Sequence, residues 1–253
     1  MSEPYPDFVA RFYEVVYAQV RDGVDNAYYL SKMGSAGGPV LEIGAGTGRL
    51  LREALRRRVD AWGIDLSPVM VERCRAQLPP EARERVTVAD AVSLRLGRRF
   101  ALAVAPFRVL SHVPVIEDQL RLLDAVHEHL VPGGTFVFDL YVPSLKLLLE
   151  GLPETCDFDG EWAPGRRLRR FVSSRPADLA RQTNHVRMTF VWDEADGEHR
   201  STWEFDMRFF FRWEIEHLVA RSKLRLEALH GDFAGGPLTA SSPEYVVVAR
   251  RDA

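Results

Sequence analysis

A glycine-rich loop between an apolar segment and a helical segment constrains the fold of this chain more than any other feature. The stretch Val40–Arg49 reads VLEIGAGTGR, with glycines at positions 44, 46 and 48. Because glycine has no Cβ, such a loop can turn sharply and let the backbone approach a ligand closely. The helix that follows offers backbone N–H groups to a polar or anionic ligand group. The loop therefore indicates an α/β domain that binds a ligand at the end of its first strand.

Apolar runs and amphipathic runs alternate along the first half of the chain. The apolar runs predict five strands, which are Val40–Ile43, Ala61–Ile64, Val86–Val88, Phe100–Ala105 and Thr135–Leu140. Helical spacing predicts helices over 47–58 and 116–130, and a third helix that begins after Ser67. Ser67 is a good N-cap, and Pro68 suits the first helical position. Repeated strand–helix units imply a parallel sheet with helices on both faces.

The alternation stops after Asp139, and the next seventy residues are rich in β-formers. Segments 168–173, 184–193 and 199–211 predict an antiparallel insertion, with Asp196-Gly197 as a hairpin turn. A helix over 213–220 and strands over 224–229 and 245–249 then return to the core. The segment between those two strands is rich in Gly, Pro and Ser and has no helical period. We therefore expect a hairpin there, which makes the last strand antiparallel.

The N-terminus shows helical spacing at 8–20 and 27–33. Together with the patterns above, this spacing predicts three regions. They are an N-terminal helical cap over 1–35, a ligand-binding core over 36–140 and 213–253, and an antiparallel β insertion over 141–212. The insertion is expected to act as a lid or as a homodimer surface.

Charge and composition argue against several classes of protein. The net charge is −3, whereas a protein that depends on many phosphate contacts usually carries a basic excess. The basic run Arg166–Arg170 is interpreted as a solvated strand edge. No apolar run approaches the roughly 18 residues of a membrane span, and no signal peptide is evident. Cys74 and Cys156 lack metal-type spacing. We expect a cytoplasmic protein with no metal, no membrane contact and no nucleic-acid partner.

The spacing of the loop separates it from a dinucleotide-binding loop. In the dinucleotide pattern the third glycine follows the first by five positions, but here Gly48 follows Gly44 by four (48 − 44). Asp65 ends the next strand, 21 positions after Gly44 (65 − 44), where a carboxylate can bind two ribose hydroxyls. Asp90 follows the third strand, where an adenine amino group could be bound. Glu42 precedes the loop by two positions.

Residues 39–140 resemble the core of class I S-adenosylmethionine-dependent methyltransferases. Glu42–Gly48 matches the E-x-G-x-G-x-G motif of that family, and Gly63–Met70 resembles its second motif. Val88–Ala91 resembles the third motif, and Leu130–Gly134 resembles its L-x-P-G-G element. The resemblance implies a Rossmann-like, seven-stranded, mostly parallel sheet of order 3-2-1-4-5-7-6 with an antiparallel last strand. It also implies that the cofactor is S-adenosylmethionine.

The same resemblance assigns expected roles to residues of the loop and of the following strands. The cofactor-binding residues that it implies are Tyr29, Glu42, Gly44, Ala45, Gly46, Gly48, Asp65, Leu66, Met70, Asp90, Ala91 and Pro106. The glycines approach the methionine portion of the cofactor, Asp65 holds the ribose, and Asp90 reads the edge of the adenine. Leu66 and Met70 flank the adenine ring.

The substrate is expected beyond the carboxyl end of the fourth strand, where the sequence reads APFRVLSH from 105 to 112. His112 is a candidate general base because imidazole titrates near neutral pH, and the alternative is a structural histidine. Arg108 could hold an anionic group of the substrate or form a salt bridge with a carboxylate of the lid. Tyr13 and Tyr17 lie in a segment similar to a Y-D-x-x-Y element, and they either close the pocket or only pack.

The expected function is transfer of a methyl group to a nitrogen or oxygen of a small molecule. A nicotinamide-dependent oxidoreductase is the first alternative, and the glycine spacing argues against it. The second alternative is a protein that binds S-adenosylmethionine without catalysis. The intact loop and the available His112 argue against that reading. No motif tied to RNA, DNA or protein substrates is evident.

Overall fold

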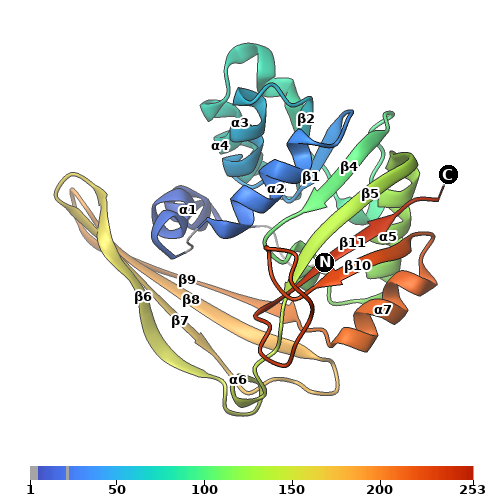
Figure 1. The fold of residues 1–253 in the computed structure, drawn as a ribbon. Coiled ribbons are helices and arrows are strands. Elements are labelled where there is room, and N and C mark those ends of the chain that lie inside the picture. The colour runs from blue at the N-terminus through green and yellow to red at the C-terminus, as the bar shows by residue number, and fades with distance from the viewer. Residues whose placement is uncertain (1–4, 21–22, 253) are drawn as a thin grey trace.

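A computed structural model describes residues 5–20 and 23–252, which form two β-sheets and the helices around them (Figure 1). The larger sheet has seven strands, which are β1 (Val40–Ile43), β2 (Ala61–Asp65), β3 (Val86–Val88), β4 (Phe100–Ala105), β5 (Leu130–Tyr141), β10 (Arg225–His230) and β11 (Glu244–Arg250). Their order is β10-β11-β5-β4-β1-β2-β3. Strands β1 to β5 are parallel, and β11 is antiparallel to both of its neighbours. The predicted order 3-2-1-4-5-7-6 with an antiparallel last strand is confirmed.

Helices cover both faces of this sheet. They are α2 (Val24–Gly34), α3 (Arg49–Arg56), α4 (Pro68–Gln77), α5 (Ile116–His129) and α7 (Arg212–Arg221). Helices α2, α3 and α4 pack on one face, and α5 and α7 pack on the other. Helix α4 begins as predicted, because the Ser67 hydroxyl accepts a hydrogen bond from the Met70 amide and Pro68 occupies the first turn. Strands β1 and β4 are apolar runs because helices bury both of their faces.

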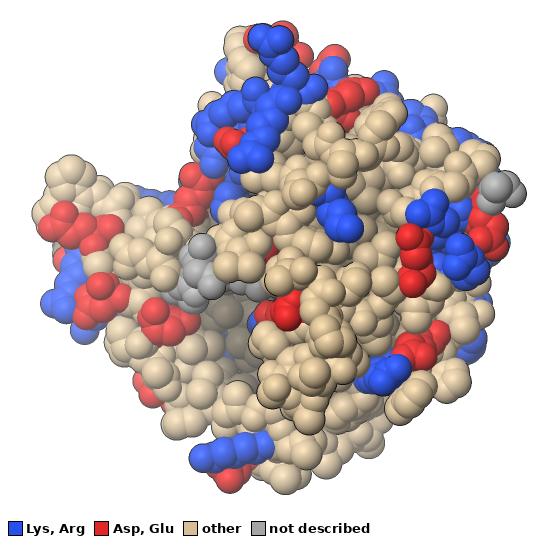
Figure 2. Space-filling view, in the orientation of Figure 1, with Lys and Arg blue, Asp and Glu red and all other residues tan. Residues whose placement is uncertain are grey.

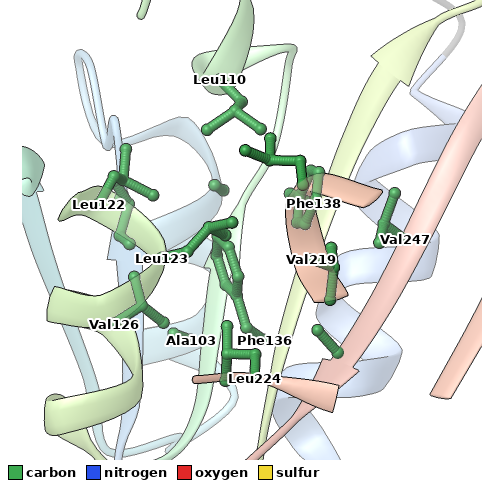
Figure 3. Close-up of a cluster of buried hydrophobic side chains, with 14 of the residues drawn as sticks. Ala103, Leu110, Leu122, Leu123, Val126, Phe136, Phe138, Val219, Leu224 and Val247 are labelled. Atoms are coloured by element: carbon green, nitrogen blue, oxygen red, sulfur yellow. The ribbon is translucent and has the colours of Figure 1, made fainter. Parts of the chain in front are cut away.

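Figure 3 shows the core on the side of α5 and α7. Phe136 and Phe138 of β5 lie 5.0 Å apart between their ring centroids and are fully buried. Leu123 of α5 and Val219 of α7 cover them. Burial of each such side chain stabilises the fold by roughly 1.5–3 kcal/mol. This core therefore holds the carboxyl ends of β4 and β5 firmly, and the candidate site lies at those ends.

The second sheet is the antiparallel insertion. Its strands are β6 (Leu152–Ala163), β7 (Arg166–Ser174), β8 (Thr183–Glu194) and β9 (Gly197–Arg208), in that order across the sheet. Helix α6 (Leu145–Glu150) leads into it, and helix α1 (Asp7–Val20) packs on its inner face. Strand β6 and helix α6 are absent from the sequence prediction, whereas the β8–β9 hairpin has its turn where Asp196-Gly197 predicted it.

The basic run on β7 corrects one expectation. Strand β7 lies between β6 and β8, so Arg166–Arg170 is not a sheet edge. Alternate arginines pair across the strands, Arg167 with Asp159 at 2.6 Å and Arg169 with Glu198 at 2.7 Å. The run is therefore largely neutralised by carboxylates of other strands of the same sheet. Within the described ranges, no helix is both long enough and apolar enough to cross a membrane.

Candidate functional site

The glycine-rich loop provides space for a ligand. Gly44 and Gly46 have φ values of 75° and 55°, a region that favours glycine. A Cβ on Gly44 would lie 2.6 Å from a methyl group of Val109, whereas a Cβ on Gly46 would meet nothing within 4 Å. The Gly44 amide donates to the Ile64 carbonyl and the Gly46 amide donates to Asp65. Gly46 therefore leaves room for a ligand, whereas Gly44 lets the loop pass close to Val109, and the amides of both are already used within the protein.

Asp65 ends β2 and connects two segments of the site. Its carboxylate accepts hydrogen bonds of 2.8 Å from the amides of Gly46 and Ser67. Burial raises the pKa of this carboxyl, and the two backbone hydrogen bonds oppose that rise. Each carboxylate oxygen has a further lone pair that a ribose hydroxyl could use. Asp90 lies across the site, where it accepts a hydrogen bond from the Val92 amide and caps a short 3-10 helix over Ala91–Ser93.

A single cavity of about 920 Å³, open mouth included, runs from these carboxylates to the end of β4. Asp65, Asp90, Leu66 and Met70 line its first part. Two carboxylates beside apolar side chains suit an adenosine group, since hydroxyls need acceptors and the adenine ring needs apolar walls. The residues present therefore fit the adenosine portion of S-adenosylmethionine. The other end of the cavity is aromatic.

The turn after β4 shapes that aromatic end. Phe107 and Arg108 both have positive φ values, 65° and 64°, which are uncommon for residues with side chains. Such a conformation costs roughly 1–3 kcal/mol, so surrounding contacts must hold it. The buried carboxylate of Asp139 accepts hydrogen bonds from the Phe107 amide at 2.8 Å and from the Tyr29 hydroxyl at 2.6 Å. Asp139 thus fixes the turn that places the Phe107 ring in the cavity.

His112 ends the short helix Val109–His112 and lines the same cavity. Its ring packs 5.5 Å from Phe205 and 6.1 Å from Tyr5, measured between ring centroids. Burial among these rings lowers the pKa of His112 to about 4. The imidazole is therefore neutral near pH 7, and it is a much weaker base than an unperturbed histidine.

Arg108 points away from this cavity and lines a second one, of about 960 Å³ with its mouth, between the core, α6 and the insertion. Its guanidinium lies 3.0 Å from the Glu244 carboxylate and 5.1 Å from the centre of the Tyr141 ring. Glu244 belongs to β11 of the core, so the expected partner in the lid is wrong. Figure 2 shows that the surface is hollowed where the antiparallel sheet meets the core.

The structure brings most of the predicted site residues to the first cavity. Those that line it are Tyr13, Gly44, Gly46, Asp65, Leu66, Met70, Asp90, Ala91, Pro106 and His112. Those that do not line it are Tyr17, Tyr29, Glu42, Ala45, Gly48 and Arg108. Tyr17 packs behind Tyr13 with 4.3 Å between ring centroids, and Gly48 lies just before α3. Glu42 is buried beneath the loop, where burial raises the pKa of its carboxyl to about 8.

Sequence reasoning missed three residues that shape the site. Tyr5 and Phe107 line the cavity, and Asp139 holds the turn beneath Phe107. Phe107 could have been found, because it stands between Pro106 and Arg108, which the sequence had already indicated as site residues. Tyr5 precedes the first helix and belongs to no periodic pattern. In the sequence Asp139 is a polar residue near the end of an apolar strand, and that position does not predict its hydrogen bonds with Tyr29 and Phe107.

Comparisons with known proteins agree with this geometry. Residues 40–134 match the methyltransferase domain family. Over 209 residues the chain is 26% identical to an N,N-dimethyltransferase of dTDP-3-amino-3,4,6-trideoxy-alpha-D-glucopyranose from Streptomyces venezuelae, covering 81% of this chain and 82% of that protein.

Two solved structures extend the comparison. An S-adenosylmethionine-dependent methyltransferase from Clostridium acetobutylicum superposes with a TM-score of 0.77 at 17% identity, covering 97% of this chain and 98% of that one. The glycopeptide N-methyltransferase MtfA in complex with S-adenosylmethionine has a TM-score of 0.57 at 26% identity, covering 91% and 94%. The fold is thus shared with a methyltransferase whose structure contains this cofactor.

Proposed function

We propose that this chain, which belongs to the class I S-adenosylmethionine-dependent methyltransferases, methylates an amino nitrogen of a small molecule. S-adenosylmethionine supplies a methyl group on a positively charged sulfur. A single cavity reaches from Asp65 and Asp90 to His112, so donor and acceptor can share one enclosed space. Alignment of two reactants in such a space can lower the barrier by roughly 7–11 kcal/mol. The nicotinamide alternative receives no support from the loop spacing or from the relatives named above.

The acceptor end of the cavity favours nitrogen over oxygen, and this observation carries the proposal. His112 has a pKa of about 4, so it is poorly suited to remove a proton from a hydroxyl. A neutral amine needs no such base, because its nitrogen is nucleophilic without loss of a proton, whereas a hydroxyl oxygen becomes strongly nucleophilic only when its proton is removed. Among the residues of the described chain that line this cavity, there is no lysine or arginine to hold an anionic acceptor. In this proposal His112 orients the amine by its neutral ring.

The size of the acceptor follows from the lid and from the relatives. Tyr13 of α1 lines the aromatic end of the cavity, and Trp203 and Phe205 of the insertion pack behind Tyr5 and His112, which supports a small acceptor over a macromolecule. The Streptomyces relative is named for dimethylation of an amino sugar, which supports an amine of similar size. Tyr13 would contact the acceptor with Tyr17 packed behind it, and Arg108 with its second cavity would receive a polar distal group.

The cofactor residues are part of the same proposal. Asp65 would bind the ribose, Asp90 the adenine edge, and the turn at Gly44 and Gly46 the methionine portion. The division into cap, core and insertion at residues 35, 140 and 212 remains a prediction. The same holds for a cytoplasmic location, for the lack of a nucleic-acid partner and for a homodimer through the insertion.

Paired acceptors test the choice of nitrogen. The protein would be incubated with S-adenosylmethionine and either 3-amino-3-deoxyglucose or glucose, and with benzylamine or benzyl alcohol. Mass spectrometry would detect the added methyl group, and Asp65→Ala would serve as the cofactor-site control. We expect methylation of the amines only. Methylation of the alcohols but not of the amines would contradict the proposal.

A further inference from the structure

The second cavity, between the core, α6 and the insertion, has a mainly apolar wall. Its volume of about 960 Å³, mouth included, is typical of a site for a small organic molecule. Leu147 of α6 lines this cavity and is still 46% exposed, so it stands at the mouth. The other aliphatic side chains of the wall include Val142, Leu148, Val172, Val186 and Met207. Such a wall favours an apolar ligand, because contact removes the apolar surface of both from water.

The second cavity shares walls with the first cavity on two sides. Phe107 lines the first cavity, and the next residue, Arg108, lines the second. On the insertion, Val186 lines the second cavity and lies opposite Phe205 in the register of β8 and β9. Phe205 in turn packs on His112 of the first cavity, with 5.5 Å between ring centroids. A molecule whose amine enters the first cavity therefore has the second cavity beside it for the rest of its structure.

The charge of the second cavity is balanced. Among the described residues that line it, Arg108 is the single charged side chain. The Arg108 guanidinium lies 3.0 Å from the carboxylate of Glu244. A phosphate or carboxylate in this cavity would lose its water and would face an arginine that already has a carboxylate partner, which is unfavourable. The cavity therefore favours uncharged groups over anions.

A few polar groups of the wall suit uncharged oxygens. The Arg108 side chain is 34% exposed, and its guanidinium has N–H groups beyond the one that pairs with Glu244. The Tyr141 hydroxyl accepts a hydrogen bond of 2.9 Å from Asn184 and keeps its own hydrogen as a donor. Burial raises the pKa of Tyr141, so this hydroxyl stays protonated. Both donors suit a hydroxyl or carbonyl oxygen, which would be the polar distal group expected at Arg108.

We propose that the second cavity holds the body of the acceptor, and that this body is uncharged and mainly apolar, with hydroxyl or carbonyl oxygens near Arg108 and Tyr141. This inference rests on the proposed N-methyltransferase function and deepens it, because it names the class of the acceptor. The amine is carried by a neutral, largely apolar scaffold. A nucleoside diphosphate is disfavoured as the carrier, since its phosphates would meet a wall whose charge is already balanced.

Three glycosides that lack an amine test the second cavity without turnover. 4-Methylumbelliferyl β-D-glucopyranoside joins an apolar ring system to hydroxyls. The corresponding glucuronide has a carboxylate in place of the hydroxymethyl group, and methyl β-D-glucopyranoside lacks the rings. Each would be titrated by calorimetry into the intact chain loaded with S-adenosylhomocysteine. We expect the umbelliferyl glucoside to bind at least about tenfold more tightly than either of the others. Equal binding of the glucoside and the glucuronide, or no binding of the glucoside, would overturn the inference.

Two substitutions on α6 show whether the probes bind in the second cavity. Leu147→Arg adds a cation without a built-in partner to the wall, so the preference for the glucoside over the glucuronide should fall at least about fivefold. Leu149→Arg adds the same charge to the same helix, at a leucine that is 65% exposed and lies outside the lining of the cavity. This control should keep the original preference. An unchanged preference in Leu147→Arg would place the probes elsewhere and would also overturn the inference.

An acceptor experiment distinguishes failure of this inference from failure of the proposed function. 3-Amino-3-deoxyglucose and its 4-methylumbelliferyl glycoside would be compared as acceptors, and the glycoside should have a KM at least about tenfold lower. Equal KM values for the two methylated amines would leave the N-methyltransferase proposal standing and remove the acceptor body from the second cavity. Binding of the umbelliferyl glucoside without methylation of any amine would instead remove the proposed function and, with it, the role of this cavity in holding an acceptor.

Discussion

The surroundings of the His112 imidazole affect how the protein responds to pH. Its pKa is about 4 in the folded protein, against 6.5 when unperturbed. Between these values the unfolded chain binds a proton that the folded chain does not. The contribution of this group to the free energy of unfolding should therefore rise as pH increases from about 4 to 6.5, by up to roughly 3 kcal/mol, whereas Glu42, with its pKa raised to about 8, contributes a slope of the opposite sign above about pH 4.5. Urea denaturation at pH 4.5, 5.5 and 7 would measure that slope.

Replacement of His112 isolates its contribution to the pH dependence of the free energy of unfolding. His112→Gln removes the titrating group, so the variant should lose much less stability between pH 7 and pH 4.5 than the original protein. His217→Gln, at an exposed histidine of α7, is the control and should keep the original slope. If the slope were the same in His112→Gln, the buried imidazole would not be its source. A neutral His112 at pH 7 is also what the proposed amine chemistry assumes.

At the scale of elements, a substitution in the loop between β1 and α3 should affect ligand binding and stability by separate physical causes. Gly46→Ala places a methyl group where the protein leaves the cavity open, at a φ of 55°. We expect a loss of roughly 1–2 kcal/mol of stability from the backbone conformation. We also expect binding of S-adenosylhomocysteine to weaken at least about tenfold, since the methyl group enters the site. Calorimetric titration and urea denaturation would measure the two effects.

Gly97 provides the matched control for this substitution. It has a φ of 63°, a Cβ there would meet nothing within 4 Å, and it does not line the cavity. Gly97→Ala should cost a similar amount of stability and leave binding of S-adenosylhomocysteine unchanged. Equal affinity in both variants would show that the loop at Gly46 is only a structural turn.

A buried arginine of the antiparallel insertion forms an ion pair inside the insertion and also contacts α1 through Tyr17. Arg170 is 2% exposed, it donates two hydrogen bonds to Asp157, and its guanidinium lies 5.0 Å from the Tyr17 ring. Arg170→Met leaves the Asp157 carboxylate without this partner, so we expect a loss of roughly 2–4 kcal/mol in chemical denaturation. Arg169→Met, on the same strand with an exposed partner, should change stability by less than about 1 kcal/mol. Similar losses in the two variants would contradict this account.

Some elements could be predicted from sequence because their burial produces a recognisable pattern of apolar residues. Strand β4 is apolar throughout since both faces are covered, and Ser67 with Pro68 marks the start of α4. Strand β6 gives no such signal, because half of its residues are exposed and Phe158 is the buried one. Helix α6 is short, with exposed leucines at 145 and 149, so it has no apolar face of the usual width.

The cofactor end of the site was more predictable than the acceptor end. Gly44, Gly46 and Asp65 lie within 22 positions (65 − 44 + 1), where local spacing constrains geometry. The acceptor end depends on contacts between distant segments, such as the bonds from Tyr29 and Phe107 to Asp139. The ion pair of Arg108 with Glu244 joins residues 136 positions apart. No local pattern encodes such pairings, so only the folded arrangement reveals them.

At the scale of the whole molecule, the first cavity connects segments from the N-terminus to α5. Tyr5 lies at one end of the chain, and His112 packs on Phe205 of the insertion. A ligand in this cavity therefore contacts the core directly and the insertion through His112. Ligand binding should consequently stabilise the protein as a unit, because opening of any of these parts would expose the ligand.

Ligand-dependent melting tests the cofactor and this coupling together. S-adenosylhomocysteine at 100 times its dissociation constant should add about 2.7 kcal/mol of stability. For a chain of this size each kcal/mol is worth roughly 2–4 °C, so a single melting transition should rise by roughly 5–10 °C. S-adenosylmethionine should act similarly, NAD⁺ should not, and Gly46→Ala should reduce the shift. A shift with NAD⁺ alone would overturn the cofactor assignment. A second transition that does not move would show that the insertion unfolds independently of the ligand-bound core.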